Sequence, residues 1–203
     1  MKNISILLLL LISYSSCSQE KKMSHTEEIE QFQYKLNVHY SDKKTSPLKP
    51  RDLRKFKSLS FFPTNKSYKI EADFTRTPDA PIFEMPTSGE KTPLYAQYGI
   101  ATFVLNGQEV TLRVYQNQKL ILDPEYYNHL FIPFNDKTNG VETYDAGRYI
   151  DLEIPKGDTI VIDFNKAYNP YCAYNDGYSC PIPPEENNLE VEVKAGVMTF
   201  QKH

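Results

Sequence analysis

The sequence predicts a mainly β protein, an antiparallel β-sandwich or partly open barrel with an N-terminal amphipathic helix packed on it. Three observations support this fold class. Apolar and polar residues alternate over several stretches after Tyr68, the pair Asn106-Gly107 marks a tight hairpin, and helical spacing of apolar residues is found before Tyr68. We expect about eight to ten strands and one or two helices.

The helix is expected over residues 26–41. Residues Ser24 to Glu27 have the sequence Ser-His-Thr-Glu, which is typical of a capping box that opens a helix. The apolar residues that follow recur at helical spacing: Ile29, Phe32, Leu36 and Tyr40. A second short helix is predicted from Pro50.

The strongest local strand signal is IATFVLNGQEVTLRVY, with Asn106-Gly107 at its centre. A type I′ turn needs positive φ at both central positions, which this pair tolerates. Counting outward from the turn gives a register in which the apolar residues share one face. This register pairs Phe103 with Val110, Ala101 with Leu112 and, on the opposite face, Thr102 with Thr111.

Two further hairpins are expected later in the chain. The segments RYIDLEI and TIVIDF flank Pro155–Asp158, and the segments LEVEVKA and VMTFQ flank Gly196. Each segment alternates apolar and polar residues, as a half-buried strand does.

The N-terminus predicts export and lipid anchoring. One lysine precedes the apolar run Ile4–Ile12, which is shorter than the about 20 residues that span a bilayer, so residues 1–16 are typical of a signal peptide. The small residues just before Cys17 resemble a bacterial lipoprotein cleavage site. We therefore expect a lipidated Cys17 and tether over 17–25, a single domain over 26–203, and a location in the bacterial cell envelope, periplasmic or on the outer membrane.

The charge of the mature chain argues against nucleic acid as a partner. Removal of residues 1–16 takes one of the 23 basic residues and leaves 22, against 26 acidic ones, so the net charge is −4. The expected partners are the membrane, through the N-terminal lipid, and a small molecule or another envelope protein. No cofactor is expected.

Two long loops interrupt the strand pattern, residues 133–148 and 165–188. Loops of this length inside a compact domain are usually functional or disordered. Arg148, at the end of the first loop, has two interpretations. It could offer its guanidinium to a carboxylate or phosphate ligand, or it could form an internal ion pair with Asp136 or Glu186.

The second loop contains Cys172 and Cys180, the two cysteines outside the leader. In an exported chain the first interpretation is a disulfide, which would close a loop of about nine residues. Free or redox-active thiols and a metal site remain as alternatives. Structural zinc usually takes four closely spaced ligands, and the spacing here does not match, so no metal is expected.

The segments FNDKTNGVETYDAGRY and DFNKAYNPYCAYNDGYSCPIPPEENNLEVEVKAG, with FKSLSFFPTNKSY upstream, strongly resemble the domain of unknown function 1684. The resemblance covers about residues 30 to 200 and implies that these segments belong to one domain. No activity is attached to this family. The resemblance implies that the following residues occupy motif positions: Asp136, Thr143, Tyr144, Gly147, Arg148, Asn165, Pro170, Cys172, Cys180, Pro181, Pro184, Glu186 and Asn187.

Two functions from different classes remain open. The first is a lipid-anchored binding or interaction module, because no complete catalytic motif such as Gly-x-Ser-x-Gly or His-Glu-x-x-His is present. Its candidate ligand-binding residues are Tyr144, Arg148, Glu186 and Asn187. The second is a hydrolase-like or redox enzyme with a site built from the two loops. Its candidate catalytic residues are Asp136, Arg148, Cys172 and Glu186, with His129 as a further member.

Overall fold

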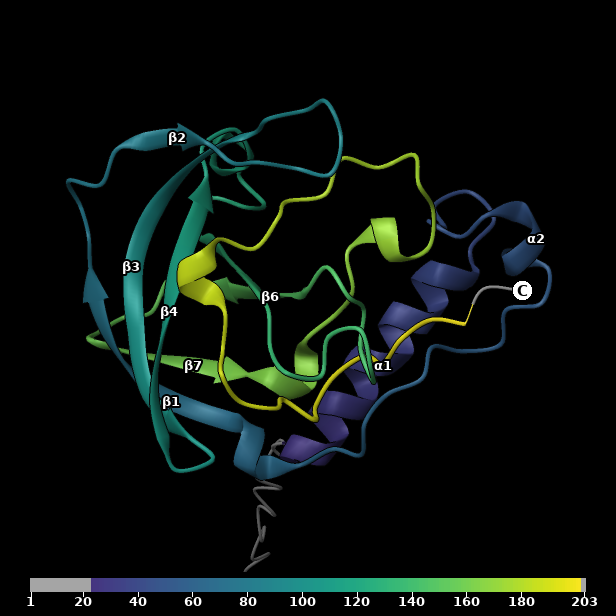
Figure 1. Ribbon diagram of the computed structural model, residues 1–203, viewed down its shortest axis with the longest axis horizontal. Helices are drawn as coiled ribbons and strands as arrows, with labels where there is room; N and C mark the ends of the chain where they lie inside the picture. The colour runs from purple at the N-terminus through teal and green to yellow at the C-terminus, as the bar shows by residue number, and fades with distance from the viewer. Residues whose placement is uncertain (1–22, 202–203) are drawn as a thin grey trace, which may run out of the picture.

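The computed structural model describes residues 23–201, so the predicted signal peptide, Cys17 and most of the predicted tether lie outside the described residues. It confirms a mainly β fold with an N-terminal helix. One antiparallel sheet of seven strands curls into a half-barrel, in the order β6-β5-β4-β3-β1-β7, with β2 paired to β3 (Figure 1). The strands are β1 (Lys69–Arg76), β2 (Ile82–Glu84), β3 (Leu94–Leu105), β4 (Gln108–Asn117), β5 (His129–Phe134), β6 (Arg148–Glu153) and β7 (Thr159–Asp163).

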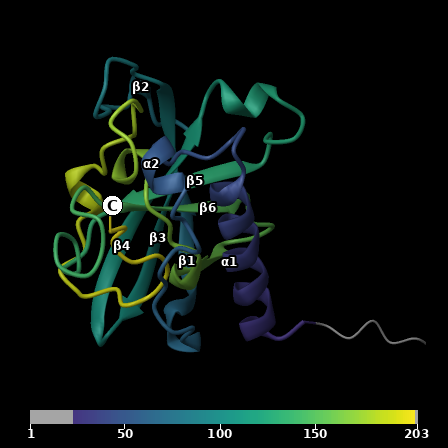
Figure 2. The same ribbon diagram turned by 90° about the vertical axis from the view of Figure 1, so that its right-hand side faces the viewer.

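The expected N-terminal helix is present as α1 (His25–Ser41), and it lies along one side of the sheet (Figure 2). Its capping box is formed in both directions: the backbone N–H of Glu27 donates to Ser24 Oγ at 3.3 Å, and the N–H of Ser24 donates to Glu27 Oε2 at 2.7 Å. The predicted second helix is the single turn α2 (Pro50–Leu53). No helix within residues 23–201 is long and apolar enough to cross a membrane.

The predicted β3–β4 hairpin is confirmed in turn and register. Asn106 and Gly107 have φ values of 51° and 80°, as a type I′ turn requires. The pairs Phe103–Val110, Ala101–Leu112 and Thr102–Thr111 lie opposite one another as counted from the turn.

The expected hairpin between RYIDLEI and TIVIDF is wrong, although both segments are strands. They form β6 and β7, which are the two opposite edges of the sheet. β6 pairs with β5 and β7 pairs with β1, so the link across residues 154–158 connects the two edges of the curl. A five-residue link fits either arrangement, and the partner strands decide between them.

The expected hairpin around Gly196 is also wrong, because residues 189–201 form no strand. The alternation there is nevertheless real: Leu189, Val191, Val193 and Ala195 are buried in the main core, while the residues between them are exposed. This C-terminal segment crosses the sheet (Figure 1, yellow). Its backbone bonds to the loop after β5 and to Ser60, Phe62 and Ala167 instead of to a strand.

Each strand divides its residues between two faces of the sheet. The inner face packs against the C-terminal segment and forms the main core, which includes Phe74, Phe103, Leu112, Ile132, Ile150 and Ile162. The outer face carries a smaller aromatic cluster of Tyr95, Tyr115, Phe131 and Tyr149. In β6, Arg148 and Ile150 therefore belong to the inner face, while Tyr149 and Asp151 belong to the outer face.

Candidate functional site

Arg148 begins β6 and forms a buried ion pair with Asp136. The side chains of both residues are 0% exposed, and Arg148 Nη2 donates to Asp136 Oδ2 at 2.8 Å. The guanidinium also donates to the carbonyl oxygens of Val193, at 2.8 Å, and Ala195. Arg148 thus fastens the C-terminal segment to the core. Of the two interpretations of Arg148, the internal ion pair is the one found, with Asp136 as the partner.

Both oxygens of the Asp136 carboxylate accept hydrogen bonds from within the protein. Its Oδ1 atom accepts from the N–H and hydroxyl of Thr138, at 2.9 and 2.6 Å, and from the N–H of Val193 at 3.0 Å. Burial lowers the pKa of Arg148, whereas the charge of Asp136 raises it and keeps the guanidinium ionised. Neither side chain of the pair has an exposed atom with which to meet a ligand.

The rest of the loop 133–148 bonds mainly to itself. Thr138 and Thr143 are buried and their hydroxyl groups lie 2.8 Å apart, and Asn139 bridges Thr143 and the carbonyl of Tyr144. The ring of Tyr144 packs against the cluster at the C-terminal end of α1. Burial raises the pKa of Tyr144, which keeps its hydroxyl neutral.

Cys172 and Cys180 form a disulfide in the loop 165–188. Cys172 therefore carries no thiolate here, which a catalytic nucleophile would need. The loop is also pinned from outside, because the N–H of Ser88 donates to the carbonyl of Cys180 at 2.9 Å, and the N–H of Cys180 donates to Ser88 Oγ at 3.1 Å.

Asn187 is a structural clamp between β4 and β5, which pair directly at Tyr115–Phe131 and diverge beyond it. Its amide nitrogen donates to the carbonyls of Arg113, at 3.0 Å, and Pro133, at 2.7 Å, and its oxygen accepts from the N–H of Arg113 at 2.7 Å. The side chain fills the gap with the hydrogen bonds that a strand would have made. This clamp holds the short turn Glu185–Asn187 rigidly against β4.

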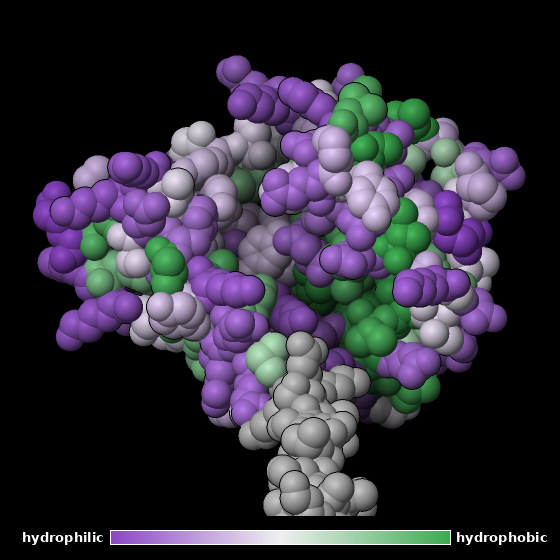
Figure 3. Space-filling model, turned by 180° about the vertical axis from the view of Figure 1, so that it is seen from behind, coloured by the Kyte–Doolittle hydropathy of each residue, from purple (hydrophilic) through white to green (hydrophobic). Residues whose placement is uncertain are grey.

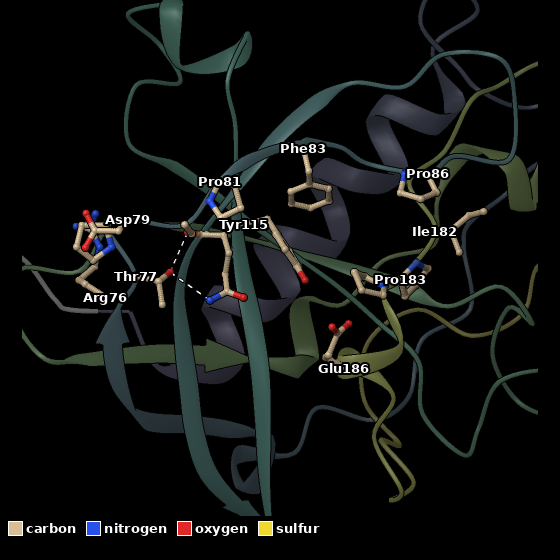
Figure 4. Close-up of a pocket in the computed structure, with 14 residues that line it drawn as sticks. Arg76, Thr77, Asp79, Pro81, Phe83, Pro86, Tyr115, Ile182, Pro183 and Glu186 are labelled. Atoms are coloured by element: carbon tan, nitrogen blue, oxygen red, sulfur yellow. Dashed lines mark hydrogen bonds between the residues drawn. The ribbon is translucent and has the colours of Figure 1, made fainter.

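The turn presents Glu186 to a cavity of about 720 Å³ on the outer side of the sheet (Figure 4). The Glu186 carboxylate and the Tyr115 hydroxyl point toward one another across this cavity. Glu186 is exposed, and it has no hydrogen-bond or ion-pair partner within residues 23–201. Around the two groups the walls are mainly apolar, formed by Pro78, Ala80, Pro81, Phe83, Pro86, Ile182, Pro183 and Pro184.

Tyr115 supplies a neutral hydroxyl to the cavity. Burial, and after it the negative charge of Glu186, raise the pKa of Tyr115 to about 12, while Arg113 lowers it. At neutral pH the phenol is therefore a hydrogen-bond donor beside a carboxylate that only accepts. The ring is held by edge-to-face packing on Phe83, at a centroid distance of 5.8 Å.

Comparison with known proteins places the chain in a family. The family model described as a protein of unknown function, DUF1684, matches residues 54–198. The chain belongs to the DUF1684 family. It is also similar to an uncharacterized protein from gene locus rrnAC0354 of Haloarcula marismortui, known from a solution NMR structure, with 34% identity over 87% of this chain and 95% of that chain and a TM-score of 0.69. No curated protein matches the chain.

This DUF1684 domain does not gather the four candidate catalytic residues. Asp136 and Arg148 lie in the buried ion pair, Cys172 in the disulfide, and Glu186 at the cavity. His129 lies in a separate groove, where it bonds to Asp151. Of the candidate ligand-binding residues, Glu186 alone lines the main cavity, and Asn187 supports it from behind.

Sequence reasoning missed Tyr115 and the proline walls of this cavity. The prolines at 78, 81 and 86 come from the segment around β2, and those at 183 and 184 come from a loop about a hundred residues later. The two segments meet because the N–H of Ile182 donates to the carbonyl of Pro86, at 2.9 Å. Both segments have a high density of proline in the sequence, but this density does not show that the two segments pack against one another.

Proposed function

We propose that this DUF1684 protein is a lipid-anchored binding protein of the bacterial envelope, and that the cavity at Glu186 is its ligand site. The observation that carries the proposal is the Glu186 carboxylate, which has no partner within residues 23–201 and is held by the Asn187 clamp at the mouth of an apolar cavity. The leader and Cys17 support the location, since together they resemble a lipoprotein signal.

The lining of the cavity indicates the chemistry of the ligand. Its volume lies in the range of about 300–1,000 Å³ that is common for small-molecule sites. Proline and aromatic walls favour an apolar body, because they bury carbon surface without offering hydrogen bonds. Glu186 requires a donor and the Tyr115 hydroxyl an acceptor, so the ligand should carry both, as an amide or an amino alcohol does.

Binding is favoured over catalysis at this site. None of the described residues that line the cavity is a histidine, cysteine, serine or lysine. The Thr77 hydroxyl is already bonded to Gln97, and the Tyr115 hydroxyl, whose pKa is about 12, is a poor proton carrier at neutral pH. The other charged lining residues, Arg76 and Asp79, lie together at the left of Figure 4, away from Glu186.

Purification of the native lipidated protein in mild detergent tests the proposal. Small molecules released on denaturation would be identified and quantified by mass spectrometry for wild type, Glu186→Gln and Glu185→Gln. Glu185 is the exposed neighbour outside the cavity, so its variant loses the same charge. We expect one molecule shared by wild type and Glu185→Gln and about tenfold lower occupancy in Glu186→Gln, since hydrogen bonds to charged groups are strong. Equal occupancy in all three, or no molecule at all, contradicts the proposal.

The anchor has its own test. Cys17→Ala removes the thiol that would carry the lipid, so the protein should move from the membrane fraction to the soluble envelope fraction. Retention of the variant in the membrane fraction contradicts the anchor and leaves the cavity proposal standing.

A further inference from the structure

A second hollow lies between α1 and the outer face of the sheet, with a volume of about 500 Å³. Viewed from behind, the molecule has a hollow near the centre of this side (Figure 3). We term the hollow between α1 and the sheet the aromatic groove. Its lining includes six tyrosines and two phenylalanines: Phe32, Tyr40, Tyr95, Phe131, Tyr149, Tyr168, Tyr171 and Tyr178. Among the described residues, none lines both this groove and the cavity at Glu186.

The hydroxyl groups of several of these tyrosines are already engaged by the protein. Tyr149 donates to the carbonyl of Pro181, Tyr168 donates to Asp151 at 2.8 Å, and the Tyr171 hydroxyl lies 2.9 Å from His39 Nε2. Edge-to-face packing of Tyr149 on Phe131 and on Tyr168 holds the rings further. Tyr40, Tyr95, Phe131 and Tyr149 are buried, so the ring surface open to a ligand comes mainly from Phe32, Tyr168, Tyr171 and Tyr178. The groove therefore offers a ligand ring surface more than free hydroxyl groups.

One negative charge lies in this aromatic lining. Among the described residues that line the groove, Asp151 is the only carboxylate, and none is lysine or arginine. Its Oδ1 accepts from His129 Nε2 at 3.0 Å and its Oδ2 accepts from Tyr168. These bonds orient the carboxylate without covering it, since the side chain remains 48% exposed. An ionised carboxylate has about four acceptor positions, so two remain for a ligand.

On the side of Asp151 that faces away from the groove, the lysines do not neutralise its negative charge, because further carboxylates lie beside them. A polar hollow there shares His129 and Asp151 with the groove, and it adds two lysines and three further carboxylates. One of these lysines, Lys69, is paired with Glu28 at 3.2 Å. The added charged residues are Lys69, Lys166, Glu125, Glu153 and Asp163.

These features select one class of ligand. An anion would find no lysine or arginine among the described residues of the groove, and a sugar would find few free hydroxyl groups. A hydrocarbon would bring no positive charge to the carboxylate of Asp151. A primary ammonium needs three acceptors, whereas a quaternary ammonium needs none and is attracted to the faces of aromatic rings. We propose that the aromatic groove binds an organic cation of the quaternary ammonium class, with Asp151 as its counter-ion.

The first test needs no variant. Full-length lipidated protein in maltoside micelles would be titrated by calorimetry with choline and with 3,3-dimethyl-1-butanol, which has the same shape without the charge. We expect choline to bind at least about tenfold more tightly, because both the rings and Asp151 act on its charge. Equal affinity of the two compounds, or no binding of choline at millimolar concentration, overturns the proposal.

The second test locates the site with variants. Asp151→Asn should weaken choline binding about tenfold, and Tyr168→Leu more than Tyr168→Phe, since the latter keeps the ring. Asp158→Asn is the matched control, because Asp158 is exposed in the link between β6 and β7 and lines neither hollow. Unchanged choline affinity in folded Asp151→Asn overturns the proposal. Glu186→Gln should bind choline as wild type does, which separates this inference from the proposed function.

A quaternary ammonium could come from a free solute or from a lipid headgroup. Dihexanoylphosphatidylcholine, a soluble short-chain lipid, would be compared with choline below its micelle concentration. Tighter binding of the lipid identifies a headgroup as the source, and tighter binding of choline identifies a free solute. Failure of both to bind overturns the proposal.

Discussion

The two long loops, 133–148 and 165–188, use their polar side chains in opposite ways. In the first loop, Asp136, Thr138 and Thr143 bond to one another and to Arg148, and all four are buried. In the second loop, the buried polar groups support a turn whose exposed Glu186 meets no partner among the described residues. A dense cluster of polar residues therefore indicates a structural role when its side chains bond to one another. It indicates a candidate site when one side chain has no partner within the described residues.

The same contrast occurs within one strand. Arg148 and Asp151 are three residues apart in β6 and both are charged, yet they face opposite sides of the sheet. The inner face buries Arg148 against the C-terminal segment, so its charge serves stability. The outer face opens into the aromatic groove, so the charge of Asp151 remains accessible. The face of the strand, and not the residue type, separates the two roles.

The largest predicted effect falls on the buried pair. Arg148→Met should lower the free energy of unfolding by about 3–5 kcal/mol, because it leaves Asp136 buried without its counter-charge. Urea denaturation measures this loss. Lys137→Met is the control, since the Lys137–Glu190 pair is exposed and should contribute less than about 1 kcal/mol. Similar losses in both variants would show that the buried pair contributes no more to stability than the exposed pair.

The disulfide should contribute the next largest effect. Replacement of Cys172 and Cys180 by serine should lower the free energy of unfolding by about 2.5 kcal/mol, the chain entropy of a loop of this size. Reductant should lower the urea midpoint of wild type to the same extent and leave the double variant unchanged. Two freely alkylated thiols in protein purified without reductant would contradict the disulfide.

Asn187→Ala should cost about 2 kcal/mol, because buried backbone groups of Arg113 and Pro133 lose their partner. The neighbouring Asn188 is exposed and bonds to Asn135, so Asn188→Ala is the matched control with a smaller expected loss. Ligand occupancy at the cavity should fall in Asn187→Ala alone, because Glu186 then loses its support. An occupancy equal to wild type would show that the clamp does not position Glu186.

The smallest effect is a pKa shift at the cavity. Glu186→Gln should lower the pKa of Tyr115 from about 12, because the charge of Glu186 contributes to raising it. NMR titration of ¹³C-labelled tyrosine measures this shift, and Glu185→Gln should leave it unchanged. The unfolded value is 10.0, so the unfolded chain ionises first. The stability from neutral Tyr115 is therefore complete below pH 10 and disappears as the pH rises to about 12.

Local signals predicted the elements that depend on neighbours in sequence. The capping box at Ser24 and Glu27 and the Asn106-Gly107 turn act over a few residues, and both were found where expected. Alternation also predicted correctly that Leu189, Val191 and Val193 are buried. It could not tell a strand from an extended segment that packs on a core, because both bury every second residue.

The sequence by itself determined the fold class, the N-terminal helix and the central hairpin, because the hydrogen bonds of these elements close over short distances along the chain. Only the tertiary structure decided that β6 and β7 are opposite edges, that Arg148 pairs with Asp136, and that Glu186 faces Tyr115. Each of these depends on contacts between residues far apart in the chain. The curl of the sheet and the path of the C-terminal segment bring them together, and no short stretch of sequence encodes either.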